Sequence, residues 1–451
     1  MKILILDVYP DVGYRISKDQ NGGYGTANDY GDSLFSKILK FFVKNSIDFP
    51  PLYSVQVCGE LIAMNHNVFF KRKEKNFKDY DLIIVTSSIV CHETEIKQIE
   101  EILKYNKKVI VIGPFASSNP NRFLKTGAKV LKGEPEMFFH NLTMDSNFFD
   151  KLPNLIENNK LHDLDELSFP AWETIFKDYI PKMKFLGKGP AITIYASKGC
   201  PYQCFYYCVY PLQQGRKVRA RSVENIIDEI KYWKKELGTN KFVFRDPVFS
   251  INRKHTIAFC KKVIEEKLDI TFMVETHLNN LDDEMIPLLR KAGLELVYVG
   301  VESSSHYVLK DMKRFTVEHD KQFQVIKKCE DAGIKVKTMF IIGNPEDSKD
   351  TIIQSIEYAK YLPSLYSQFS VFTPYPGTPA YNDFKDIITE NKLENFNQYN
   401  LTFKHKNLTK KNISDLKSLA YFRFYFNLKK MFQILKYFLK SKYEKKNKWV
   451  G

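Results

Sequence analysis

Two successive series of short β-branched runs, each separated by amphipathic segments, constrain the fold of this 451-residue chain. The first series predicts five strands, at residues 2–7, 67–71, 82–87, 108–113 and 128–132. Helices are expected near 52–65, 93–106 and 119–126. Several of the runs are apolar throughout, which is typical of strands buried on both faces of a parallel sheet. Residues 1–145 are therefore predicted to form a doubly wound (Rossmann or flavodoxin-like) α/β domain, with ligands at the carboxyl ends of its strands.

The second series follows a proline-containing connector at residues 146–190. It predicts six strands, at residues 191–196, 241–245, 270–275, 295–300, 335–342 and 368–373. The intervening helices are expected near 222–236, 253–266, 282–292, 319–332 and 349–361. Six β/α units predict a partial (β/α)6 barrel over residues 191–385, with its chemistry at the carboxyl ends of the strands. A helical, basic extension is expected at 386–451, and residues 11–50 read as an insertion over the edge of the first sheet.

The charge of the chain is concentrated at one end. The net charge is +15, but residues 401–451 contain 14 Lys and Arg against two acids, so the first 400 residues carry only +3. This distribution argues against a nucleic-acid-binding body. Seven cysteines are too few for a disulfide scaffold, no apolar run is long enough to span a membrane, and Asp7 interrupts the apolar start. These features favour a cytoplasmic enzyme with reduced thiols.

Three cysteines, Cys200, Cys204 and Cys208, lie in one loop, KGCPYQCFYYC, directly after the first predicted barrel strand. Closely spaced thiolates on one loop are how proteins hold iron–sulfur clusters. Three ligands would leave one iron of a four-iron cluster open to an exogenous group. Zinc is the alternative metal, disfavoured because no nearby His or fourth Cys completes a tetrahedron. Three small buried hydrophobes are the non-functional alternative.

Further motifs follow the predicted strands in a fixed order. They are RDPVFS at 245–250, VETH at 274–277, GVESSS at 300–305, IIGNPEDS at 341–348 and TPYPGTP at 373–379. Before the barrel, residues 49–68, GPFAS at 113–117, KGEPE at 132–136 and DLDELSFPAWE at 163–173 belong to the same pattern. Together with the cysteine loop, these motifs resemble the radical SAM superfamily over nearly the whole chain, in its branch with an N-terminal cobalamin-binding domain. That branch includes radical C-methyltransferases and the anaerobic ring cyclase of chlorophyll synthesis.

The resemblance implies a set of cofactor contacts in the barrel. Cys200, Cys204 and Cys208 would hold a [4Fe-4S] cluster whose fourth iron chelates S-adenosylmethionine (SAM). The other SAM contacts that it implies are Tyr207, Asp246, Glu302, Ser303 and Gly343. The chain departs from the superfamily pattern, because it reads Cys-x3-Cys-x3-Cys and has Tyr207 where the third cysteine is expected. One extra residue adds at most about 3.3–3.6 Å of reach, which a loop can absorb, so Cys208 is expected to be the third ligand.

The resemblance also implies cobalamin at the edge of the N-terminal sheet. The residues expected there are Ser87, Gly113, Ser117 and Glu134. The DxHxxG signature that supplies a histidine ligand to cobalt is absent, so the corrin is expected to bind without one. A domain that has lost cobalamin and only packs on the barrel is the alternative.

The resemblance therefore predicts a radical SAM enzyme that cleaves SAM to a 5′-deoxyadenosyl radical. The expected reaction is cobalamin-dependent methylation or rearrangement at an unactivated carbon of an unidentified small-molecule or lipid substrate, with an external electron donor. The alternatives are a cobalamin-independent radical SAM enzyme and a catalytically impaired relative that binds cobalamin or a partner. A tRNA-modifying methylthiotransferase is disfavoured, because only Cys58 and Cys91 precede the barrel and three further cysteines would be needed for a second cluster.

The C-terminal segment 420–443 interleaves aromatic residues with lysines, as in Phe422, Phe426, Lys430 and Phe432. A helix with an aromatic and a lysine-rich face is typical of interfacial membrane binding. Peripheral contact with a membrane through this segment is therefore one expectation. A helix docked on the barrel with solvated lysines is the other.

Overall fold

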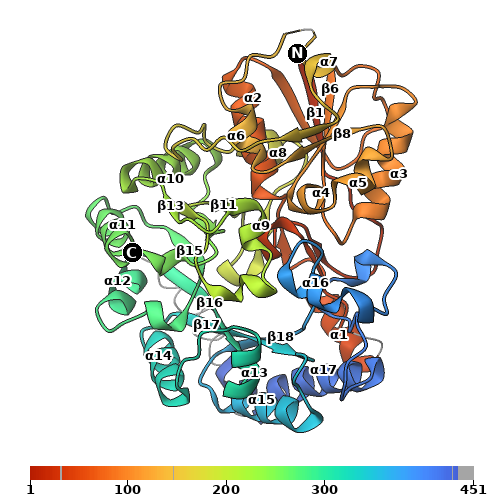
Figure 1. Cartoon of the computed structure of the whole chain (residues 1–451). Coiled ribbons are helices and arrows are strands. Elements are labelled where there is room, and N and C mark those ends of the chain that lie inside the picture. The colour runs from red at the N-terminus through yellow and green to blue at the C-terminus, as the bar shows by residue number, and fades with distance from the viewer. Residues whose placement is uncertain (31–32, 146, 429, 435–451) are drawn as a thin grey trace.

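The computed structural model describes residues 1–30, 33–145, 147–428 and 430–434. Figure 1 shows two α/β domains joined by a connector. The N-terminal sheet has the order β5-β1-β6-β7-β8-β9, and all its pairs are parallel. Its strands are β1 (Lys2–Leu6), β5 (Asn67–Lys71), β6 (Leu82–Thr86), β7 (Val109–Ile112), β8 (Lys129–Lys132) and β9 (Leu155–Glu157). The five predicted strands are confirmed. The sheet has a sixth, β9, within the range assigned to the connector.

Helices cover both faces of this sheet. They are α2 (Leu52–Ala63), α3 (His92–Leu103), α4 (Pro114–Ser118), α5 (Pro120–Leu124), α6 (Pro135–Phe139) and α7 (Phe148–Lys151). Helix α2 is buried over most of its length, because the connector with α8 (Trp172–Phe176) covers its outer side. A Cβ atom on Gly59 would come within 2.2 Å of the Phe169 carbonyl oxygen, so this close approach requires glycine.

The second sheet contains six parallel strands in chain order, which confirms the predicted partial barrel. They are β11 (Ile192–Ile194), β14 (Lys241–Phe244), β15 (Thr271–Thr276), β16 (Leu294–Glu302), β17 (Lys335–Ile342) and β18 (Tyr366–Val371). The helices outside them are α10 (Val223–Leu237), α11 (Arg253–Glu265), α12 (Met285–Lys291), α13 (His306–Asp311), α14 (His319–Asp331) and α15 (Lys349–Tyr361). Helix α10 begins after Ser222, whose side chain accepts a hydrogen bond from the Asn225 amide and caps the helix.

Residues 11–50 reach beyond the edge of the first sheet. They form the hairpin β2 (Ile16–Ser17) and β3 (Thr26–Ala27), the helix α1 (Leu34–Val43) and the strand β4 (Ile47–Asp48), which pairs with β10 (Lys182–Met183). The Tyr24 hydroxyl donates to the Pro376 carbonyl over 2.8 Å, and Asn28 donates to the Tyr399 hydroxyl over 2.5 Å. The segment therefore crosses from the N-terminal sheet to the open side of the barrel, where α1 lies beside α17 (Figure 1).

The C-terminal part closes the same side of the barrel. Helix α16 (Pro379–Phe384) follows β18, and α17 (Lys410–Tyr425) packs on α15 and β18. The helix expected within 420–443 is interrupted: α17 ends at Tyr425, and residues 428 and 430–434 are again helical. Tyr421 and Phe424 of α17 are buried. Lys430 is also buried and donates to the Leu362 and Ser364 carbonyls. Residues 435–443 lie outside the described residues. No helix in the described part of the chain is long and apolar enough to cross a membrane.

Candidate active site

The cysteine loop occupies residues 199–218, between the paired strands β12 (Ser197–Lys198) and β13 (Arg219–Ala220). Gly199 has φ +88°, and a Cβ there would lie 2.1 Å from the Lys217 carbonyl oxygen, so the neck of the loop requires glycine. Within the loop, the Cys200 amide donates to the Gly215 carbonyl over 3.2 Å, and the Cys208 amide donates to the Cys204 carbonyl over 2.9 Å. The extra residue before Cys208 is absorbed in this turn.

The three thiols share one environment. Cys200 and Cys204 are buried and Cys208 is half-buried. A hydrogen bond from the Cys208 thiol, supported by the charge of Arg314, lowers the pKa of Cys204 to about 6 against the opposing effect of burial. Burial raises the pKa of Cys200. Cys204 is thus a thiolate at neutral pH, which is the form that binds metal.

The arrangement of the three cysteines helps to distinguish an iron–sulfur cluster from a single zinc ion. Four thiolates around one zinc ion at about 2.3 Å have sulfur–sulfur distances of about 3.8 Å. Among the described residues, the three Sγ atoms do not all lie within 4.8 Å of one another, and no His, Asp or Glu joins them as a fourth ligand. Three thiols on one loop without a fourth ligand fit a cluster with one open iron better than a closed zinc site.

Arg314 connects this loop to the end of β16, and sequence reasoning missed it. Its Nη1 lies 3.8 Å from the Cys204 Sγ, and its Nη2 lies 3.5 Å from the Glu302 Oε1 and donates to the Gly300 carbonyl over 3.1 Å. Burial raises the pKa of Glu302 to about 7, although Arg314 opposes the shift. In sequence, Arg314 is one of several basic residues after α13, and only the fold places it beside the cysteines.

Glu302 has an unusual backbone conformation. Its φ is +67°, in the left-handed region, and β16 shifts register against β17 between Gly300 and Glu302. A side-chain-bearing residue held there costs about 1–3 kcal/mol. The carboxyl group faces Arg314 at the carboxyl end of the strand.

The other predicted SAM contacts lie around the same end of the barrel. Tyr207 is half-buried and faces the Phe372 ring at 6.0 Å, and burial followed by the Glu302 charge raises its pKa. Ser303 is buried, and its hydroxyl accepts a hydrogen bond from the Ser305 amide over 3.1 Å. Gly343 has φ +71° and packs against Ile413 of α17.

Asp246, which follows β14, holds the chain at the start of the cysteine loop. Its carboxylate accepts hydrogen bonds from the Ala196 amide at 3.0 Å and from the Ser197 hydroxyl at 2.6 Å. Burial raises the pKa of Asp246 to about 6 in spite of these bonds. Both oxygens are engaged, so Asp246 fixes the start of the cysteine loop.

The predicted cobalamin contacts gather at the carboxyl edge of the N-terminal sheet, but they bond to one another. The Ala116 amide donates to the Ser87 hydroxyl over 3.0 Å. The Ser117 hydroxyl donates to the Gly113 carbonyl over 2.9 Å. Gly113 has φ +117°, and a Cβ there would lie 2.4 Å from the Tyr53 hydroxyl.

Glu134 joins the two domains. Its carboxylate is ion-paired with Lys198 at 3.1 Å and with Arg219, one on each strand of the hairpin that carries the cysteine loop. Glu136 is also ion-paired with Lys198. This network fixes the edge of the N-terminal sheet against the base of the loop.

Three buried side-chain amides at the domain interface have no hydrogen-bond partner among the described residues. They are the amide nitrogens of Asn21, Asn119 and Gln213. Asn21 lies in the turn at 21–23, Asn119 ends α4, and Gln213 lies on α9 (Tyr210–Gln214), and these three elements contact one another. Such donors suit the amide groups on the periphery of a corrin. The cavity beside them has an empty volume of only about 280 Å³.

Comparisons with known proteins agree with this geometry. Residues 194–359 match the profile of the Radical SAM superfamily. An uncharacterized methyltransferase of Pyrococcus horikoshii is 26% identical over 387 residues, which cover 80% of this chain and 83% of that protein. A bacteriochlorophyllide d C-8(2)-methyltransferase of Chlorobaculum tepidum is 26% identical over 373 residues, 79% of this chain and 78% of that protein.

Solved structures show the same arrangement of domains. The radical S-adenosylmethionine methyltransferase TsrM of Kitasatospora setae, solved with cobalamin and a [4Fe-4S] cluster bound, superposes with a TM-score of 0.62 at 15% identity. The superposition covers 85% of this chain and 74% of TsrM. Residues 194–359 thus form a radical SAM domain, and the chain has the fold of TsrM, with an α/β domain before the barrel.

Proposed function

We propose that this protein is a cobalamin-dependent radical SAM methyltransferase that acts on an unactivated carbon atom. The main observation in support is the group of contacting side chains at the carboxyl end of a six-stranded half-barrel. Arg314 contacts both the Cys204 thiolate and Glu302 there. The two methyltransferases that match about four-fifths of the chain support the reaction type. An external electron donor is required, because cleavage of SAM consumes an electron.

The protein's own residues hold and orient the reacting groups. Cys200, Cys204 and Cys208 would ligate a [4Fe-4S] cluster, which with SAM supplies a 5′-deoxyadenosyl radical. Arg314 balances negative charge beside Cys204, and it holds the Glu302 carboxyl group in reach of a bound ligand. Burial of this end of the barrel excludes water from a reactive intermediate.

Cobalamin would lie between the carboxyl edge of the N-terminal sheet and the cysteine loop. When bound, it supplies the methyl group. Asn21, Asn119 and Gln213 would donate hydrogen bonds to its amides. A cavity of about 280 Å³ is below the roughly 300–1,000 Å³ of sites for drug-sized ligands, and a corrin is larger still. Binding therefore requires the turn at 20–24 to move away from Pro114 and Tyr210, which it contacts closely.

Anaerobic reconstitution with iron and sulfide tests the cluster. We expect about four iron atoms per chain and formation of 5′-deoxyadenosine from SAM with a strong reductant. Cys204→Ala should lose both. Cys260→Ala is the matched control, because Cys260 is buried in α11 away from the loop. Iron binding that survives Cys204→Ala would refute the proposed ligand set.

Titration of the reconstituted protein with hydroxocobalamin tests the corrin site separately. We expect a change in the corrin spectrum at one equivalent, which Asn119→Leu should weaken. SAM cleavage without any cobalamin binding would instead identify a cobalamin-independent radical SAM enzyme.

The protein is also proposed to bind the surface of anionic membranes without crossing them. Helix α1 exposes Leu34, Phe41 and Phe42, each 70–78% accessible, and α17 beside it exposes Phe422 and Phe426. Phe35 of α1 contacts both α17 rings, at 5.9 and 5.2 Å. The apolar face predicted in the C-terminal segment is thus extended by a second helix. The sequence that follows is lysine-rich, and each lysine near an anionic surface contributes about 1 kcal/mol of binding.

Sedimentation with vesicles containing 30% phosphatidylserine tests this surface. Burying one Phe side chain is worth about 1.5–3 kcal/mol, so Phe41→Ser with Phe42→Ser should weaken binding at least tenfold. Leu161→Ser is the control, because Leu161 is 60% exposed elsewhere. Equal binding by the double variant would refute the role of α1.

A further inference from the structure

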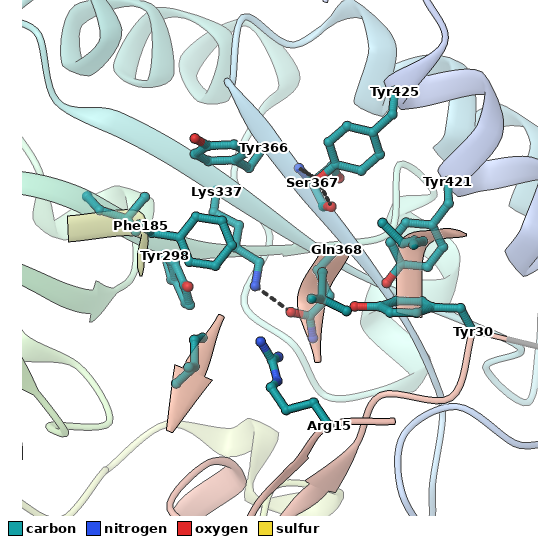
Figure 2. A pocket seen from close by; sticks show the side chains of 14 residues that line it. Arg15, Tyr30, Phe185, Tyr298, Lys337, Tyr366, Ser367, Gln368, Tyr421 and Tyr425 are labelled. Atoms are coloured by element: carbon teal, nitrogen blue, oxygen red, sulfur yellow. Dashed lines mark hydrogen bonds between the residues drawn. The ribbon is translucent and has the colours of Figure 1, made fainter. Parts of the chain in front are cut away.

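A cavity with an empty volume of about 540 Å³ lies inside the barrel, on the side closed by residues 11–50 and α17 (Figure 2). Strands β16, β17 and β18 form one wall, and α1 and α17 form the other. Six of the fourteen lining residues are aromatic: Tyr30, Phe185, Tyr298, Tyr366, Tyr421 and Tyr425. An aromatic lining with a few polar groups directed at one space is typical of a small-molecule site.

Two cations face this cavity from opposite walls. Figure 2 shows the Arg15 guanidinium and the Lys337 ammonium directed at the same space as the Gln368 amide. Lys337 donates to the Gln368 Oε1 over 2.6 Å and lies 4.3 Å from the Tyr298 ring centre. Arg15 donates to Asn28 over 2.9 Å and to Ser46 over 2.6 Å. All these partners are neutral.

The charges inside this part of the barrel do not balance. Below the pKa of Lys337, three cations, Arg15, Arg245 and Lys337, face two carboxylates, Asp19 and Glu275. Arg245 is ion-paired with Asp19 and lies 3.9 Å from Glu275. The excess positive charge therefore rests on Arg15 and Lys337. A buried charge without a counter-charge is costly, so this arrangement is suited to a ligand that supplies an anion.

Lys337 lies near the start of β17, far from the carboxyl ends of the barrel strands. Along β17, Lys337, Met339 and Ile341 point into the barrel and are half-buried, whereas the intervening Thr338 and Phe340 are fully buried. Six residues at about 3.3 Å each separate Lys337 from Gly343 at the carboxyl end, a distance of about 20 Å. A ligand that binds Lys337 must be elongated to reach the cysteine loop.

We propose that Arg15 and Lys337 bind the anionic end, a carboxylate or a phosphate, of an elongated and largely apolar substrate whose reacting carbon lies about 20 Å away, at the carboxyl ends of the strands. The aromatic lining contacts the apolar part. Helices α1 and α17 line the cavity and also carry the exposed apolar surface, so the same two helices connect a membrane surface with this interior. The substrate assignment rests on the proposed function, but the anion site does not.

Calorimetric titration of the protein without its cofactors tests the anion site independently of catalysis. The probes are decyl phosphate, decanoate and the neutral 1-decanol, each below its aggregation concentration. We expect one equivalent of at least one acid to bind, with 1-decanol at least tenfold weaker. The stronger acid identifies the source of the anion. Failure of both acids to bind, or equal binding of the alcohol, would overturn the proposal.

Variants locate the site. Lys337→Met and Arg15→Met should each weaken binding of the acid at least tenfold, while Lys328→Met, which removes an exposed lysine of α14, should bind as the parent does. Because the two cations repel each other in the empty cavity, Lys337→Met should not lower the unfolding midpoint of the ligand-free protein. A lysine with a purely structural role would give a lower midpoint and unchanged binding of the acid, and that result would refute the site.

Discussion

Replacing Lys18 by methionine is predicted to destabilise the N-terminal domain strongly. Lys18 is completely buried, and its Nζ lies 2.9 Å from the Asp7 Oδ1 and 2.8 Å from the Glu95 Oε1. It also donates to the carbonyls of Val8 and Thr86, at 3.1 and 3.0 Å. The side chain thus connects residues 11–50 to the carboxyl ends of β1 and β6.

The cost follows from what remains after the change. Removing one partner of a buried ion pair typically costs 3–5 kcal/mol, because the other charge stays buried without compensation. Here two carboxylates would remain. Asp7 keeps a hydrogen bond from Thr86 at 2.7 Å, and Glu95 keeps the Ser88 amide at 3.1 Å. These hydrogen bonds partly compensate the two carboxylates. We therefore expect Lys18→Met to lower the unfolding free energy by about 3–5 kcal/mol in total at pH 7.5.

The deficit should depend on pH with a defined sign. Even with Lys18 present, burial raises the pKa of Glu95 to about 7, above its ordinary value of 4.5. Without Lys18 the pKa of Glu95 should rise further, because Lys18 lowers it in the parent. Below pH 7 both folded proteins bind this proton, so the deficit relative to the parent changes little there. Above pH 7 only the folded variant keeps the proton that the unfolded chain releases, so the deficit should grow as pH rises and be smaller at pH 5.5 than at pH 7.5.

Urea unfolding followed by circular dichroism at both pH values measures this effect. Lys97→Met, on an exposed position of α3, is the matched control and should change the unfolding free energy by less than about 0.5 kcal/mol. Adding Glu95→Gln to Lys18→Met should recover part of the loss. A Lys18→Met variant within 1 kcal/mol of the parent at pH 7.5 would refute the reasoning.

Two further predictions concern other buried positions. Burial, followed by repulsion from Arg15, lowers the pKa of Lys337 from 10.5 to about 7 against the attraction of Glu275, the other charged group near it. The unfolded chain then binds more protons between these values, so this lysine's contribution to the unfolding free energy should rise with pH, by about 2 kcal/mol between pH 7 and 9. Lys337→Met should lack this increase in urea titrations at the two pH values. Gly59→Ala should destabilise by at least about 2 kcal/mol in the same assay, because the added Cβ meets the Phe169 carbonyl at 2.2 Å, and a stability equal to the parent's would show that the connector moves freely.

The regular parts of both sheets follow from local sequence. Continuous apolar runs such as 82–87 and the six barrel runs fall on strands within one to three residues. Strand β9 was missed because Leu155–Glu157 is only three residues long and becomes a strand by pairing with β8, a contact with no local signal. The helical period in the C-terminal segment was correct for α17. Phe422, Phe426 and Phe432, on the aromatic side of this segment, are exposed. Tyr421 and Phe424, on the other side of α17, pack against β18.

The residues of the candidate site also fall into those that local sequence predicts and those that only the fold reveals. Cys200, Cys204 and Glu302 could be predicted, since each lies in a motif of fixed spacing after a strand. Arg314 and Arg15 could not, because their significance comes from groups far away in the chain. A lone basic residue in a loop has the same local appearance whether it faces solvent or a buried thiolate. Only the folded chain shows which one it meets.

The long reach of residues 11–50 has a consequence for the order of folding during synthesis. Tyr24 bonds to Pro376, a partner 352 residues later in the chain. At about 5–20 residues per second, roughly 20–70 s pass between the synthesis of the two. Throughout that interval the first segment lacks the surface that it closes, and its aromatic residues are available to chaperones or to other chains. The N-terminal domain therefore cannot reach its final form before the barrel is complete, and fragments that end before β18 should be prone to aggregate.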